Sequence, residues 1–167
     1  MPHPDPEIYA AAELVGQKLQ QRQLSIAVAE SCTGGLLGAA LTDVPGSSAY
    51  FLGGVIAYAN IVKVELLGVA QAVLDTEGAV SSMTAAAMAD GVRKLYKADI
   101  GISITGVAGP AEEEHKPAGL TYIATSFPFS QSARYKWAGD RWSNRRQSVL
   151  AALQLLAEGL GEPLEIH

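Results

Sequence analysis

The chain has 167 residues, of which 49% are hydrophobic and 17% charged, so it can fill the core of one globular domain and is not expected to be disordered. Its formal net charge is −5, and no run of five or six like charges occurs. A general nucleic-acid-binding protein carries a basic face, so this composition argues against that class.

Cysteine and histidine are too few for several kinds of site. Cys32 is the only cysteine, which excludes an internal disulfide and a multi-thiolate metal centre. His3, His115 and His167 form no ligand pattern, so we expect neither a metal nor a cofactor. No charged leader followed by an apolar segment opens the sequence, and no apolar run approaches 18 residues. We therefore expect a cytoplasmic protein without a membrane partner.

The first third of the chain predicts a helix, a strand and a second helix. Residues 1–6 carry three prolines and are expected to be a loose arm, and apolar residues at helical spacing follow it over 8–19. Residues 24–29 alternate as a strand whose second face is small, as under a covering helix. A glycine-rich helix over 33–42 and a Pro-Gly turn over 43–48 come next.

The rest of the chain continues the alternation of strands and helices. Strands are predicted over 50–60 and 99–110, separated by a short helix over 61–69 and a long helix over 78–98. A glycine-rich loop over 111–119 leads to a hairpin of strands over 120–126 and 133–139, and a helix over 141–161 ends the chain. This order predicts an α/β fold in which a mixed sheet lies between helical layers.

Polar residues gather where three predicted strands end, over 30–35, 58–63 and 105–110. In layered α/β folds, ligands bind beyond the carboxyl ends of the strands. We therefore expect these three segments to form one site.

Ser31 is the first candidate for a nucleophile, because it lies on a strand-to-helix turn. Unpaired N–H groups at the head of a helix can stabilise an oxyanion, and Gly34 and Gly35 let the backbone approach a ligand. The structural alternative is that Ser31 or Thr33 only caps the helix. Cys32 is a second possible nucleophile, but it has no histidine partner and is more simply a small buried thiol.

Lys63 is the candidate base, since no histidine is placed to serve Ser31. A lysine desolvated among apolar side chains has a lowered pKa and can accept a proton, although a lysine is more often an ordinary solvated surface residue. Tyr58 and Asn60 flank the same turn. Tyr58 either relays a proton or holds the substrate, or it is a core tyrosine with one satisfied hydroxyl.

Ser48 is an alternative nucleophile or a substrate ligand, unless it only caps its turn. The glycine-spaced segment 103–110 lacks the lysine of a P-loop and the spacing of a dinucleotide fingerprint. Its backbone amides and the Thr105 hydroxyl either line a pocket or form a plain tight loop. Arg141 and Arg145 lie four residues apart at the start of the last helix, where they could hold a phosphate or form surface ion pairs.

Several segments occur in an order that resembles one family. They read AESCTGG, PGSSAYFLGGVIAYANIVK, LGV, GAVS, SITGVAGP, KPAG and GDR…RR. Over about residues 30–146 the chain resembles the nicotinamide-nucleotide amidase family (PncC), which is also the C-terminal domain of CinA, the competence/damage-inducible protein.

The resemblance implies a three-layer α/β/α sandwich, whose sheet we expect to be mixed and mostly parallel, as a single domain over 1–167. It also implies hydrolysis of the carboxamide of nicotinamide mononucleotide in pyridine nucleotide salvage, and leans towards a homo-oligomer. The family motifs place the catalytic roles on Ser31, Lys63 and Tyr58. The expected substrate-binding residues are Glu30, Thr33, Gly34, Gly35, Ser48, Asn60, Thr105, Gly106, Ala108, Gly109, Arg141 and Arg145.

This chain departs from the family pattern in two respects. The family commonly carries Asp-Gly-Gly after its Ala-Gly-Pro, whereas residues 110–119 read PAEEEHKPAG, so the specificity could differ. The chain has no room for the N-terminal CinA domain, so we expect a stand-alone form. Two alternatives stay open: an amidase of another substrate, and a catalytically silent module that senses a nucleotide or binds a partner.

Overall fold

A five-stranded sheet forms the middle layer of the computed structural model, which describes residues 3–161. The strands lie in the order β2-β1-β3-β4-β5, and β1 pairs parallel with both β2 and β3, while β3–β4 and β4–β5 are antiparallel. The expected α/β fold with a mixed sheet is confirmed, with two parallel and two antiparallel pairings. The strands are β1 (Ile26–Glu30), β2 (Phe51–Ile56), β3 (Ile100–Gly106), β4 (Leu120–Ser126) and β5 (Gln131–Lys136).

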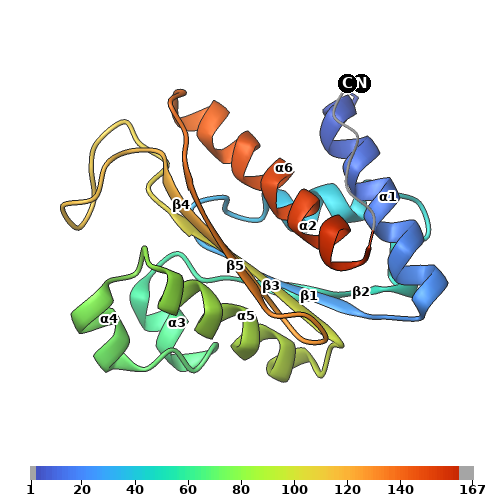
Figure 1. The fold of residues 1–167 in the computed structure, drawn as a ribbon, viewed down its shortest axis with the longest axis horizontal. Coiled ribbons are helices and arrows are strands. Elements are labelled where there is room, and N and C mark those ends of the chain that lie inside the picture. Colours follow the sequence, from blue (N-terminus) through green and yellow to red (C-terminus); the bar gives the residue numbers. More distant parts are fainter. Residues whose placement is uncertain (1–2, 162–167) are drawn as a thin grey trace.

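Helices cover both faces of this sheet, which gives three layers (Figure 1). One layer consists of α1 (Pro6–Arg22), α2 (Leu36–Thr42) and α6 (Arg141–Gly159). The other consists of α3 (Asn60–Glu65), α4 (Gln71–Glu77) and α5 (Ser82–Tyr96). A short 3-10 helix, Ser47–Ala49, precedes β2. Within the described range, no helix is both long and apolar enough to cross a membrane.

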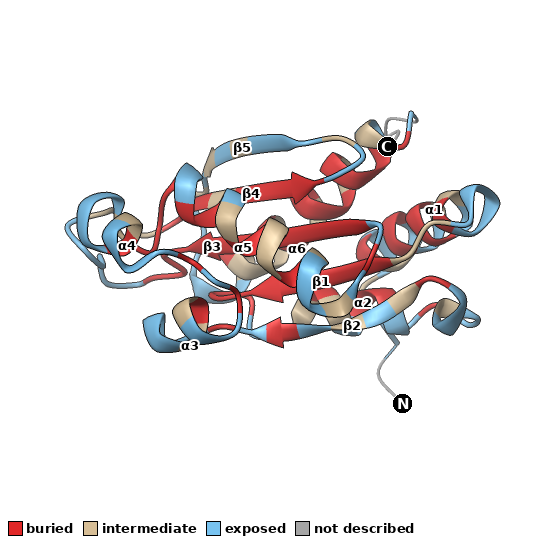
Figure 2. Cartoon of the chain, turned by 90° about the horizontal axis from the view of Figure 1, so that it is seen from below, coloured by how far each residue is buried: buried red, intermediate tan, exposed pale blue. Residues whose placement is uncertain are grey.

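The alternation of residue size along β1 explains how the two helical layers pack. Ile26 and Val28 belong to the core shared with α1, α2 and α6, whereas Ala27 and Ala29 belong to the core beneath α5. Small residues allow α5 to approach closely: a Cβ atom at Gly101 of β3 would lie 2.0 Å from the main-chain oxygen of Ala89 in α5. The sheet interior is accordingly buried on both faces (Figure 2).

Two local predictions need correction. The arm predicted over 1–6 is structured at its end, because Asp5 caps α1 through the N–H groups of Glu7 and Ile8 and also accepts hydrogen bonds from Arg146. Residues 1–2 of that arm lie outside the described residues. Helix α4 was not predicted, since it is only seven residues long and no side chain caps its N-terminus.

The topology positions the site. Because β1, β2 and β3 are parallel, their carboxyl ends meet at one edge of the sheet. The segments that follow them begin at Ser31, Ala57 and Val107.

Candidate active site

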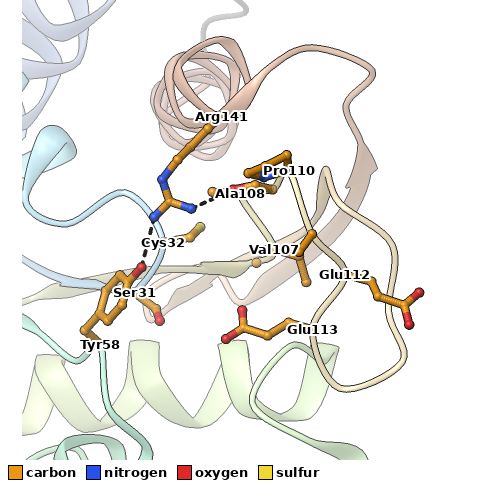
Figure 3. Close-up of a pocket in the computed structure, with 12 residues that line it drawn as sticks. Ser31, Cys32, Tyr58, Val107, Ala108, Pro110, Glu112, Glu113 and Arg141 are labelled. Atoms are coloured by element: carbon orange, nitrogen blue, oxygen red, sulfur yellow. Dashed lines mark hydrogen bonds between the residues drawn. The ribbon is translucent and has the colours of Figure 1, made fainter.

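A pocket of about 270 Å³ opens at the edge where these three parallel strands end (Figure 3). Ser31 and Cys32 line it after β1, Tyr58 after β2, and residues 106–113 at and beyond the end of β3. Arg141 reaches it from the first turn of α6. The three polar segments predicted to form one site do come together.

Ser31 is held by its own main chain at the end of β1. Its N–H donates to Ile104 O at 2.9 Å, and its carbonyl accepts from the Gly34 N–H at 3.1 Å. Gly34 and Gly35 have φ angles of 60° and 103°, which favour glycine, so these two residues allow the chain to turn into α2. The Ser31 side chain is 8% exposed and lines the pocket.

Lys63 is the largest buried polar side chain of the site and is only 1% exposed. Its Nζ lies 3.2 Å from Ser31 Oγ, 2.7 Å from Ala57 O and 3.2 Å from Tyr58 O. A neutral amine has two N–H donors and one lone pair. An ammonium at this position would donate to all three oxygens, whereas a neutral amine with its two N–H groups on the carbonyls would turn its lone pair towards the Ser31 hydroxyl.

The environment shifts Lys63 towards that neutral form. Burial lowers the pKa of Lys63 below its ordinary value of 10.5, because the ammonium is poorly solvated there. The carboxylates of Glu114 and Glu113 act in the opposite direction without reversing the shift. The sequence-based expectation of a desolvated lysine beside Ser31 therefore matches the geometry.

Cys32 is not a credible nucleophile in this setting. Burial raises the pKa of its thiol to about 12, so almost none of it is thiolate at neutral pH. The geometry agrees with the small buried thiol that the sequence allowed as an alternative.

We therefore expect Cys32 in the folded protein to resist iodoacetamide at pH 8. Alkylation requires the thiolate, and burial withholds it by raising the pKa of the thiol. Intact-mass measurement should show no added carbamidomethyl group after a treatment that fully labels the urea-unfolded chain. Rapid labelling of the folded protein would contradict this interpretation.

Tyr58 and Arg141 together form the outer rim of the pocket. The Tyr58 side chain is 61% exposed, and its hydroxyl accepts from Arg141 Nη2 at 3.0 Å. Arg141 Nη1 also donates to Gly109 O at 2.7 Å, so the guanidinium joins the segment after β2 to the loop after β3 (Figure 3). Tyr58 is thus a rim residue and not the core tyrosine of the alternative interpretation.

Glu30 and Thr33, which were predicted to bind substrate, do not line the pocket. Glu30 is 1% exposed, and its carboxylate accepts from the Thr33 hydroxyl at 2.6 Å and from the N–H groups of Leu37 and Gly38 at 2.9 and 3.0 Å. These are the unpaired N–H groups of the first turn of α2. Glu30 therefore caps α2 from the preceding strand, and Thr33 supports that cap.

Thr105 and Ser48, also predicted as site residues, do not line the pocket either. Thr105 is buried, and its hydroxyl donates to Ala79 O at 2.7 Å, tying β3 to the segment before α5. Ser48 lies in the 3-10 helix that precedes β2, whereas Tyr58 follows the other end of that strand. Six residues of strand span roughly 20 Å, so Ser48 lies at the opposite edge of the sheet from the pocket.

The remaining predicted residues divide into two groups. Gly106, Ala108 and Gly109 line the pocket as expected. Arg145 does not line it: its Nη2 donates to Thr33 O at 3.0 Å, which holds the turn after β1 against α6. Asn60 is the exposed first residue of α3 and is likewise not a lining residue.

Comparison with known proteins gives the family. A model of the CinA C-terminal domain matches residues 8–160. The chain belongs to this family. A CinA-like protein of Thermosynechococcus vestitus is 50% identical over 154 residues, which cover 89% of this chain and 37% of that protein. A CinA-like protein of Synechocystis is 50% identical over 147 residues, or 87% of this chain and 35% of that protein. The chain therefore spans little more than a third of the length of these relatives.

Solved structures of the CinA superfamily have the same fold. The competence/damage inducible protein CihA of Agrobacterium tumefaciens superposes with a TM-score of 0.91 at 34% identity, covering 97% of this chain and all of that one. A CinA superfamily protein of Escherichia coli gives 0.88 at 32% identity, covering 95% and 94% of the two chains.

Two features of this CinA-family site escaped the sequence analysis. Asn144 is 3% exposed in α6, where its Nδ2 donates to Ala108 O at 2.9 Å and its Oδ1 accepts from Gly139 N at 3.0 Å, so it fixes the pocket loop. A polar residue on the buried stripe of α6 is the signal that could have revealed it. The acidic residues Glu112 and Glu113 line the pocket, whereas the sequence analysis had interpreted them only as a departure from the family pattern.

Within residues 3–161, no group of three or more acidic, histidine or cysteine residues is arranged to hold a metal.

Proposed function

We propose that this domain hydrolyses the carboxamide of nicotinamide mononucleotide to nicotinic acid mononucleotide and ammonia, with Ser31 as nucleophile and Lys63 as its base. The observation that carries the proposal is the 3.2 Å contact between Lys63 Nζ, which is buried, and Ser31 Oγ, which lines an open pocket. Burying a lysine is costly, and a module that only binds a nucleotide has no need of an amine beside a serine hydroxyl.

The chemistry proceeds through an acyl-enzyme. Lys63 takes the Ser31 proton as Oγ bonds to the amide carbon, and the carbonyl electrons move onto oxygen. The resulting ammonium returns the proton to the amide nitrogen, the C–N bond breaks, and ammonia leaves an ester on Ser31. Water then attacks this ester while Lys63 accepts its proton, and cleavage of the ester releases the acid and restores the Ser31 hydroxyl.

Main-chain N–H groups would stabilise the oxyanion formed in both steps. The Gly34 N–H is excluded because it donates to Ser31 O. The N–H groups of Cys32 and Thr33 directly follow the nucleophile. The Thr33 N–H donates to no protein acceptor among residues 3–161, and the Cys32 N–H interacts only with the sulfur of its own side chain. They are the donors that we assign to the oxyanion.

The pocket suits a substrate with a carboxamide at one end and an anionic group at the other. Arg141 lines the pocket from α6, above Ser31 and Tyr58 in the view of Figure 3, and a guanidinium there can bind a phosphate through its remaining N–H groups. Arg145, which was expected to share this role, is instead hydrogen-bonded to Thr33 O. Arg141 is thus the phosphate ligand in our proposal, and Tyr58 holds its guanidinium in place.

We expect ammonia release from nicotinamide mononucleotide, and much less from nicotinamide, glutamine or asparagine, which lack the phosphate that Arg141 would hold. Enzyme-coupled ammonia detection with mass spectrometry of the acid product tests this. Turnover of a different amide alone would support the amidase of another substrate. Binding of the nucleotide without any product would support the silent binding module.

A further inference from the structure

The segment that departs from the family pattern, residues 110–119, forms a fixed wall of the pocket. Glu113 and Lys116 close a tight turn, with Glu113 N donating to Lys116 O at 3.0 Å and Lys116 N to Glu113 O at 2.8 Å. This turn places Glu113 beside the space into which Ser31 opens.

Two charged side chains dock this turn onto the connection between α4 and α5. Glu114 accepts from the N–H groups of Ala79 and Val80 at 3.0 and 3.4 Å. Lys116 Nζ donates to Glu77 O at 2.7 Å and to Val80 O at 2.6 Å. Four hydrogen bonds to main-chain groups therefore hold the wall, and the neighbouring Glu113 is attached to a fixed support.

Glu113 and Glu112 differ in direction although they are adjacent. The Glu113 carboxylate points into the pocket towards Ser31, whereas the Glu112 carboxylate points outward (Figure 3). In the part of the chain that the structure describes, the Glu113 side chain forms no hydrogen bond or ion pair with another residue. The pocket thus offers an uncommitted carboxylate near the nucleophile and the Arg141 guanidinium on another side.

We propose that Glu113 is a specificity-determining residue that selects a carboxamide attached to a positively charged ring. The inference rests on the proposed function, in which the carboxamide must lie against Ser31, so that its ring lies beside Glu113. A nicotinamide ring bonded to ribose through nitrogen carries a positive charge, and a carboxylate within a partly enclosed pocket attracts it. Glu113 would then bind the positively charged ring of the substrate, and Arg141 its negatively charged phosphate.

The reduced, 1,4-dihydro form of nicotinamide mononucleotide is a matched probe. It has the same carboxamide, ribose and phosphate, but its ring is neutral. Binding of both forms is best measured by titration calorimetry in a Ser31→Ala background, because no turnover then complicates the dissociation constant.

In that background, Glu113→Gln should weaken binding of the oxidised nucleotide about tenfold and change the affinity for the reduced nucleotide by less than about twofold. Glu112→Gln removes the same charge from the adjacent residue and should leave both dissociation constants unchanged. The proposal would be overturned by an equal effect of Glu113→Gln on both ligands, by no effect on either, or by the same effect from Glu112→Gln. It would also be overturned by a Ser31→Ala protein that binds neither form. Failure of the proposed function has a different signature: wild-type protein that releases no ammonia, whatever the ratio of the two affinities.

Discussion

Ser31→Ala should lower kcat for ammonia release from nicotinamide mononucleotide by about three orders of magnitude or more. Alanine removes the only hydroxyl within hydrogen-bonding distance of Lys63 Nζ among the described residues. The main-chain contacts that hold residue 31, to Ile104 and Gly34, do not involve its side chain. The fold and the substrate affinity should therefore be retained, and the loss should appear in kcat and not in the dissociation constant.

Ser48→Ala is the matched control, since it removes the same hydroxyl from the serine that the sequence offered as the other nucleophile. Ser48 lies before β2 at the far edge of the sheet, so kcat should stay within about twofold of the wild-type value. A Ser31→Ala enzyme with near-normal turnover would remove Ser31 from the mechanism. A large loss of kcat in Ser48→Ala would mean that the reaction takes place near Ser48, at the edge of the sheet opposite the pocket.

The location of the site could be predicted from sequence because it follows from topology. Parallel strands bring their carboxyl ends together, and unusual polar residues follow each of three strands. The pairing of Ser31 with Lys63 came from the absence of any other base and from the family motifs. The distance between Lys63 Nζ and Ser31 Oγ and the burial of Lys63 depend on the turn after β2, in which the carbonyls of Ala57 and Tyr58 hold the amine. No sequence pattern encodes those main-chain contacts.

The positions of Glu30 and Thr105 outside the pocket lining could have been predicted by following strand alternation. Glu30 lies on the same face of β1 as Val28, and that face meets α2. Thr105 shares a face of β3 with Ser103, and both hydroxyls donate to main-chain oxygens in or before α5. Residues at a strand end still belong to one face of the sheet. The pocket is formed by the residues immediately beyond the strands.

The acidic wall could not have been predicted in the same way. Glu114 and Lys116 bind main-chain groups of residues 77–80, which are more than 30 positions away in the sequence. Backbone donors and acceptors exist at every residue, so such docking leaves no trace in side-chain composition. The sequence of the three consecutive glutamates, 112–114, therefore gave no sign that one caps backbone N–H groups, one faces the pocket and one faces outward.

Lys63→Met should lower kcat for ammonia release about as much as Ser31→Ala does. It removes the proton acceptor while keeping a long side chain of similar volume. Lys63→Arg should not restore activity, since a guanidinium stays protonated and cannot act as a base. Lys94→Met is a suitable control: this lysine is largely exposed on α5, where it pairs with Asp90. Near-normal turnover in Lys63→Met would show that another group accepts the Ser31 proton.

The pH dependence of the wild-type enzyme tests the same group without a mutation. The base works only when it is neutral, so kcat/KM should be low at acidic pH and rise as Lys63 loses its proton. Burial disfavours the ammonium, which lowers the pKa of Lys63 from 10.5, so the midpoint of this rise should lie below 10.5. A rise centred at or above 10.5 would mean a solvated, charged lysine, and the 3.2 Å contact with Ser31 would then be an ammonium donating to a hydroxyl that it cannot deprotonate.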